Sequence, residues 1–177
     1  MKELSLNILD IAMNSVKAGA TLIEIMIDER NGWRTLTIRD NGCGMSPEFA
    51  AAVTDPFTTT RTTRKVGMGL PLLKLAAEQA GGTMSLITSQ GEDHGTTVRA
   101  TFLMDHLDCV PLGDYASTMV TLIQGSPDID FVFQYRRNTD EINLSTAEMR
   151  QVLGDVPLDT PEVLAWVAES LRSPEES

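Results

Sequence analysis

Cysteine, histidine and long apolar runs are scarce in this sequence, and each shortage excludes a class of protein. Cys43 and Cys109 lie far apart and fit neither a zinc cluster nor a CxxC motif, so we expect a reducing, cytoplasmic compartment. No apolar run approaches the ~20 residues that span a bilayer, and residues 1–5 lack a signal-peptide pattern, so we expect no membrane association. His94 falls in an expected loop, His106 has no metal partner at ligand spacing, and we assign neither a site role.

Basic residues are also few, and their shortage is uneven along the chain. Fourteen Lys and Arg face 25 Asp and Glu, a net charge of −11, which argues against nucleic acid as the main ligand. Residues 1–104 carry ten basic and eleven acidic side chains, whereas residues 105–177 carry four and fourteen. The 177 residues fit one domain, or one domain with a small appendix. The charge asymmetry predicts a boundary near Asp105, between a first part of near-neutral charge and an acidic extension.

The first helix is expected over residues 5–19, ended by Gly19. Four apolar side chains share one helical face and are expected to face a core: Leu6, Leu9, Met13 and Val16. Four polar side chains share a second face: Asn7, Asp10, Asn14 and Lys17. A short stripe of amides and an acid on a mostly apolar helix favours a lined cleft, and a solvated face is the alternative.

A carboxylate at a strand end is the most suggestive feature of the first half. Residues 21–28 and 33–38 alternate as strands, joined by the two-residue hairpin signal Asn31-Gly32. Asp40 lies at the end of the second strand, and Gly42 and Gly44 follow within four residues. The acid can accept a hydrogen bond from an amino group, and the glycines permit close backbone approach or positive φ. The pattern suits the binding of a flat ligand, and a plain turn is the alternative.

A second glycine pair follows a cationic segment. Residues 58–66 lack apolar periodicity and predict a mobile loop. They carry three cations: Arg61, Arg64 and Lys65. Gly67-Met68-Gly69-Leu70 then opens a helix that runs through Ala80. A glycine-rich helix N-terminus beside cations predicts a phosphate site, with a tight turn and simple solubility as the alternatives.

The remaining elements are read from capping, turn and alternation signals. A short helix is expected to begin after the N-cap Ser46 and to end at Val53, and strands are expected at 83–88 and 96–104. A helix at 112–124, strands around 131–135 and 141–144, and helices after Ser145 and Thr160 follow.

Four motifs in order resemble the GHKL ATPase superfamily, which includes DNA gyrase, the ninety-kilodalton heat-shock chaperone, histidine kinases and MutL. The motifs are Asp10-Ile11-Ala12-Met13-Asn14, Asp40-x-Gly42-x-Gly44, Gly67-Met68-Gly69-Leu70 and Gly95-Thr96-Thr97-Val98. The resemblance covers residues 4–104 and implies a histidine-kinase-like ATP-binding domain of the Bergerat fold. That fold is an α/β (α+β) two-layer sandwich, whose mixed, mostly antiparallel sheet has helices on one face. Residues 105–177 would add a small α+β extension.

Two branches of the superfamily are represented in the details. The run Ala18-Gly19-Ala20-Thr21 is similar to MutL. Lys17, Asp55-Pro56-Phe57 and Gly81-Gly82-Thr83 instead resemble histidine kinases, so the kinase and anti-sigma-kinase branch is favoured.

The resemblance implies a set of roles. Asn14 would coordinate Mg²⁺ and Asp40 would accept from the adenine amino group, with Thr96 supporting that contact. The glycines of both motifs would allow close approach of the backbone to the nucleotide and lid movement: Gly42, Gly44, Gly67 and Gly69. Leu70, which follows Gly69, would also belong to the nucleotide site. Phosphate charge would be neutralised by four cations: Lys17, Arg61, Arg64 and Lys65.

Two departures limit the expected chemistry. Hydrolytic members carry Glu four residues before the metal-binding Asn, whereas Asp10 stands there with one methylene less, so hydrolysis is expected to be slow or to depend on a partner. No hairpin bearing a phospho-accepting His precedes Met1, so neither autophosphorylation on such a His nor membrane sensing is expected.

The favoured function is a stand-alone regulatory kinase, like an anti-sigma-factor kinase, or a slow ATPase. It would act on a regulatory partner protein, with a homodimer as an option. The alternative is an ATP-gated interaction module without turnover.

Overall fold

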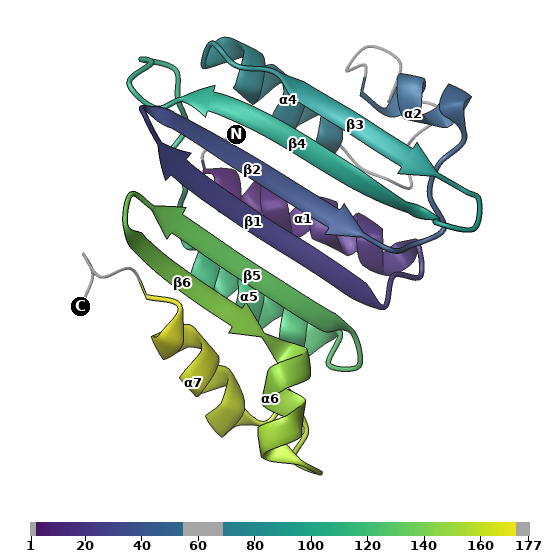
Figure 1. The fold of residues 1–177 in the computed structure, drawn as a ribbon, viewed down its shortest axis with the longest axis vertical. Coiled ribbons are helices and arrows are strands. Elements are labelled where there is room, and N and C mark those ends of the chain that lie inside the picture. Colours follow the sequence, from purple (N-terminus) through teal and green to yellow (C-terminus); the bar gives the residue numbers. More distant parts are fainter. Residues whose placement is uncertain (1–2, 55–68, 173–177) are drawn as a thin grey trace.

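Six strands form one sheet in the order β3-β4-β2-β1-β5-β6 (Figure 1). This computed structural model describes residues 3–54 and 69–172. The strands are β1 (Leu22–Arg30), β2 (Trp33–Asp40), β3 (Met84–Ser89), β4 (Gly95–Leu103), β5 (Asp130–Arg137) and β6 (Asp140–Ser145). Only the β1–β5 pair is parallel among these strands, and the other pairs are antiparallel. The expected mixed, mostly antiparallel sheet is confirmed.

Among the described residues, the helical layer lies on one face of this sheet. The helices are α1 (Leu4–Lys17), α2 (Pro47–Val53), α4 (Gly69–Gln79), α5 (Tyr115–Gly125), α6 (Thr146–Leu153) and α7 (Pro161–Ser170). Figure 1 shows α1, α4 and α5 behind the sheet, and no helix of residues 3–54 and 69–172 lies across its front face. The two-layer architecture is therefore as expected. No helix in the described parts of the chain is long and apolar enough to cross a bilayer.

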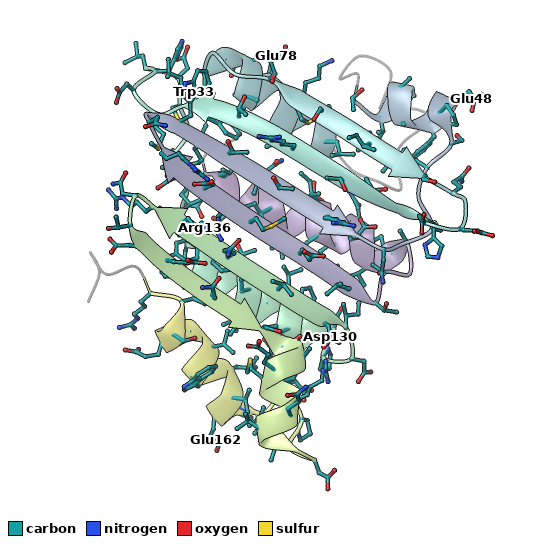
Figure 2. All side chains as sticks on the ribbon, in the orientation of Figure 1. Trp33, Glu48, Glu78, Asp130, Arg136 and Glu162 are labelled. Atoms are coloured by element: carbon teal, nitrogen blue, oxygen red, sulfur yellow. The ribbon has the colours of Figure 1, made fainter. Side chains whose placement is uncertain are left out.

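The β1–β2 hairpin fixes where the chemistry-bearing strand ends lie. Asn31 and Gly32 both adopt positive φ (54° and 80°), as a two-residue turn of this kind requires. The antiparallel register runs from that turn to the far end of β2, where Asp40 pairs with Ile23 on β1 and with Thr96 on β4. Figure 2 shows Trp33 at the turn end of the sheet and Asp130 at the opposite end, beside the start of β1.

The first helix packs through a different apolar face from the one we expected. Its sheet-facing residues are buried: Leu4, Ile8, Ile11, Ala12 and Ser15. Leu6 and Met13, which we expected in the core, are 55% and 39% exposed. Leu9 and Val16 are only partly buried against the core. This helix is apolar on most sides, so spacing alone does not reveal which side the sheet will cover.

Other local signals are confirmed by hydrogen bonds. Ser46 caps α2 by accepting from the Phe49 amide at 3.1 Å, and Ser145 caps α6 by accepting from the Glu148 amide at 3.4 Å. Gly81 ends α4 with φ of +80°.

The acidic second part of the chain continues the same sheet and the same helical layer. After β4 the chain crosses the helical face through α5 and returns as β5, parallel to β1. The α5 helix packs on α1, with the Thr118 hydroxyl donating to the carbonyl of Ser5 at 3.1 Å. Apolar residues of both parts belong to one buried cluster.

A buried ionic group ties three strands together at the turn end of the sheet. Glu29 of β1 is 5% exposed and accepts from Arg34 Nε of β2 at 2.6 Å and from the Tyr135 hydroxyl of β5 at 2.5 Å. Arg34 also donates to the carbonyl of Val110, in the segment that leads to α5. Burial, together with the bond to Glu29, raises the pKa of the Tyr135 phenol.

We expect Tyr135→Phe to lower the free energy of unfolding by about 1–3 kcal/mol, because a buried carboxylate oxygen loses its donor. Urea denaturation at pH 7 measures this loss, with the exposed hydroxyl deletion Ser85→Ala as the control. The raised pKa means that the native state holds the phenolic proton while the unfolded chain releases it above pH of about 10. The wild-type advantage over Tyr135→Phe should therefore shrink above that pH. Equal denaturation midpoints at neutral pH would show that the hydroxyl contributes nothing.

Candidate functional site

A hollow opens on the helical side of the sheet, at the end where β2 finishes. It is open to solvent, and its cavity volume among the described residues is about 40 Å³. Its lining comes from α1, the strand ends of β2 and β4, the loop after β2 and the start of α4: Ile11, Asn14, Ser15, Ala18, Ile38, Asp40, Gly44, Met45, Leu70, Thr96 and Val98. Most of these side chains are apolar and a few are polar, which is the usual lining for a small heteroaromatic ligand.

The Asp40 carboxylate is held in one orientation by two donors. Its Oδ1 accepts from the Gly42 amide at 2.8 Å, and its Oδ2 accepts from the Ser15 hydroxyl at 2.6 Å. Each carboxylate oxygen has two acceptor sites, so the acid retains capacity for a further donor from the hollow. The side chain is therefore both fixed and able to accept from a ligand.

Ser15 was not among the residues we expected at the site. It is 4% exposed and lies on the sheet-facing side of α1, one residue after Asn14. The available signal was a small hydroxyl residue in line with the apolar positions Ile8, Ile11 and Ala12. That pattern marks a buried polar group, but it does not identify a partner 25 residues away.

The loop after Asp40 is attached to its surroundings residue by residue. The Asn41 side-chain oxygen accepts from the amides of Thr21 and Leu22 at 2.8 and 3.0 Å. The Cys43 amide donates to the carbonyl of Ala18 at 2.9 Å. The loop therefore closes the hollow as a fixed wall beside the C-terminal end of α1.

The glycines of this loop stand where a side chain would collide. Gly44 has φ of +76°, and an added Cβ would overlap the carbonyl oxygen of Ser89. A Cβ on Gly42 would come within 2.9 Å of the Ala18 methyl group. Both positions thus require glycine for packing, and Gly44 also requires it for its backbone conformation.

Thr96 and Asn14 complete the polar lining. Thr96 is buried next to Asp40 in the sheet, and its hydroxyl lies 2.9 Å from that of Thr88. Thr88 in turn accepts from the amide of Met45 at 2.8 Å, so the hydroxyl pair joins the strand ends to the loop. Asn14 reaches the hollow from α1 and offers an amide oxygen, the hard type of donor that Mg²⁺ prefers.

Asp10 lies about one turn before Asn14 on α1, beside the N-terminus of α4. The Asn7 amide donates to the carbonyl of Gly69 at 2.8 Å and fixes α4 against α1. A Cβ on Gly69 would come within 2.7 Å of Asp10 Oδ2, so the carboxylate lies directly beside the first turn of α4. Asp40 and Asn14 line the hollow, whereas Asp10 is an exposed residue outside its lining, next to the first residue of α4.

The remaining expected site residues are distributed differently. Lys17 is exposed on the last turn of α1 and is not part of the lining of the hollow. Four others lie outside the described residues: Arg61, Arg64, Lys65 and Gly67. Within residues 3–54 and 69–172, no group of three His, Cys, Asp or Glu side chains is placed to hold a metal ion.

Comparison with known proteins finds one family model over most of this region. The model of the histidine kinase-, DNA gyrase B- and HSP90-like ATPases matches residues 1–106. Similar curated proteins include a putative sensor protein of Shewanella frigidimarina, 28% identical over 61% of this chain, and the sensor protein SrrB of Staphylococcus aureus, 32% identical over 55%. A putative NtrY-like sensor histidine kinase of Rickettsia conorii is 26% identical over 61%. The matched regions make up only 16–18% of these relatives.

The fold itself resembles a solved structure. The ATPase domain of Aquifex aeolicus MutL, complexed with ADP, superposes with a TM-score of 0.51 at 17% identity. The match covers 80% of this chain and 63% of that one, so it extends beyond residue 104 into the acidic part.

We expect Gly44→Ala to lower the free energy of unfolding by at least about 2 kcal/mol, because the new methyl group meets Ser89 and the backbone has positive φ. Gly91→Ala is the matched control, since the nearest described atom to an added Cβ there is the Ser89 hydroxyl oxygen at 3.7 Å. Urea denaturation of both variants measures the difference. A Gly44→Ala variant as stable as Gly91→Ala would mean that the loop sits farther from β3 than the structure places it.

Proposed function

Because the chain belongs to the family of histidine kinase-, DNA gyrase B- and HSP90-like ATPases, we propose that it binds ATP with Mg²⁺ in the hollow beside α1. Bound ATP would serve as phosphoryl donor to a regulatory partner protein, with slow hydrolysis as a side reaction. One relative is named a putative sensor histidine kinase and others are named sensor proteins, which supports the kinase direction for a shared domain, although each relative is several times longer than the match.

The single observation that carries this proposal is the fixed carboxylate in an apolar hollow. Asp40 retains acceptor capacity that faces a slot walled by Ile38, Val98 and Leu70. Adenine presents an amino donor at the position where guanine presents a carbonyl acceptor. A carboxylate that cannot turn away would attract the first and repel the second, so the site would select adenine.

The phosphate end of the nucleotide would lie toward Asn14 and the start of α4. Mg²⁺ usually keeps several waters and binds through one or two protein oxygens plus phosphate oxygens, a mode that one amide such as Asn14 can support. The N-terminus of α4 favours phosphate through the helix dipole and its backbone amides. The proposal assigns charge neutralisation to Lys17 and to the segment with Arg61, Arg64 and Lys65.

Asp10 is the proposed acid–base residue. In phosphoryl transfer, a bond forms from the acceptor oxygen or nitrogen to the γ-phosphorus, the bond to the β–γ bridging oxygen breaks, and ADP leaves. Asp10 would orient the acceptor and take its proton. Its side chain lies beside Gly69 and is one methylene shorter than that of Glu, so its reach toward a water is shorter and hydrolysis would be slow.

We expect Asp40→Asn to weaken ATP binding about ten- to a hundredfold, because a carboxylate acceptor is replaced by an amide that can present a donor to the adenine amino group. Calorimetric titration measures the affinity, and circular dichroism checks that the fold is kept. The same change at the exposed Asp159, far along the chain in the segment before α7, is the control. Undiminished affinity in Asp40→Asn would disprove the adenine assignment.

Turnover is tested by incubating the purified chain with γ-labelled ATP and Mg²⁺, with and without cell lysate. We expect label on a lysate protein, slow release of free phosphate, and a loss of both by about 10²–10⁴-fold in Asp10→Asn with ATP affinity kept. Free phosphate alone would support an ATPase. ATP binding with neither product, unchanged by Asp10→Asn, would support the ATP-gated interaction module.

A further inference from the structure

The turn between β3 and β4 closes against the loop that follows Asp40. Figure 1 shows this turn beside the end of β2. Where the turn ends, Gly95, the first residue of β4, has φ of +151°, and a Cβ there would overlap the carbonyl oxygen of Asp40. The preceding residue, His94, reaches across to the loop, and its Nδ1 lies 2.6 Å from the carbonyl oxygen of Gly42. We call residues 40–45 the adenine loop, because the proposed function, on which the following inference rests, places adenine against Asp40.

The proton in this contact lies on Nδ1, because a carbonyl oxygen only accepts. The neutral Nδ1–H form and the imidazolium both supply that donor. The Gly42 carbonyl and the Cys43 amide belong to one peptide unit, and the Cys43 amide donates to the carbonyl of Ala18 at 2.9 Å. The plane of this peptide is therefore held from both sides, by His94 and by the end of α1.

The held peptide leads directly to Asp40. The amide of Gly42 donates to Asp40 Oδ1 at 2.8 Å, so one glycine is bonded to the carboxylate through its N–H and to His94 through its C=O. Rotation of this residue would break both bonds. His94 itself lies outside the lining of the hollow and acts only through Gly42.

We propose that His94 is a positioning residue that sets the base specificity of the nucleotide site. Its Nδ1–H fixes the Gly42–Cys43 peptide and thereby the orientation of Asp40. The consequence is confined to the adenine end, because Asn14 and Asp10 belong to α1, which the Asn7–Gly69 bond fixes against α4. Loss of the donor should weaken ATP binding and reduce the preference for ATP over GTP, while contacts to phosphate persist.

Two substitutions that are isosteric with each other isolate the hydrogen-bond donor of His94. His94→Asn places an amide N–H at the same distance from Cα as Nδ1, whereas His94→Asp places only an acceptor there. His94 is an exposed residue, so neither change opens the core. We expect His94→Asp to lose about tenfold in ATP affinity and a similar factor in the ratio of ATP to GTP affinity. His94→Asn should stay within about threefold of the wild type. His106→Asn controls for loss of a histidine elsewhere.

Three results would overturn the inference: wild-type ATP affinity in His94→Asp, an equal loss in His94→Asn, or a parallel loss for GTP. Amide hydrogen exchange of the nucleotide-free chain gives a second readout, in which His94→Asp should exchange faster at Gly42 and Cys43 than His94→Asn. Equal exchange in the two variants also overturns it. If the wild type binds no ATP, the proposed function fails, and the exchange experiment still decides whether His94 holds the loop.

Discussion

The candidate site depends on the immobilisation of one carboxylate at the end of a strand. Asp40 is held by the Ser15 hydroxyl from one side and by the Gly42 amide from the other. The first bond requires α1 to lie at a fixed depth on the sheet, and the second requires a loop without side chains. A carboxylate free to rotate would accept from water as readily as from a ligand, so any selectivity of Asp40 would come from these constraints.

The α1 helix meets these requirements because its sides serve different neighbours. Its apolar side packs on the sheet and carries Ser15 to Asp40. The next side brings Asn14 to the hollow and Asn7 to the first turn of α4. Consecutive residues on a helix are about 100° apart, so Asn14 and Ser15 can face the hollow and the sheet respectively. A small shift of α1 would therefore disturb both ends of the site together.

Much of this could be read from local sequence, and the failures have a common cause. Positive φ at Asn31-Gly32 and the Ser46 cap were predictable because their energetics act within a few residues. The buried face of α1 was predicted wrongly, because a helix that is apolar on most sides leaves the choice to tertiary packing. The bonds of Ser15 to Asp40 and of His94 to Gly42 were not predicted, because these partners lie 25 and 52 residues apart along the chain. Alternation likewise predicted β5 but not that β1 would be its neighbour.

The acidic part of the chain also contributes to the site, although its residues do not line the described hollow. Without β5, the strand β1 would be an edge with unpaired backbone groups, while its buried side chains Ile23, Ile25 and Ile27 would lose a neighbour. The same segment supplies α5, which packs on α1 and bonds to Ser5 through Thr118. Because the position of α1 sets the Ser15–Asp40 bond, the contacts of β5 and α5 stabilise the orientation of the Asp40 carboxylate indirectly. The high negative charge of residues 105–177 therefore accompanies a structural role in the sheet and the helical layer.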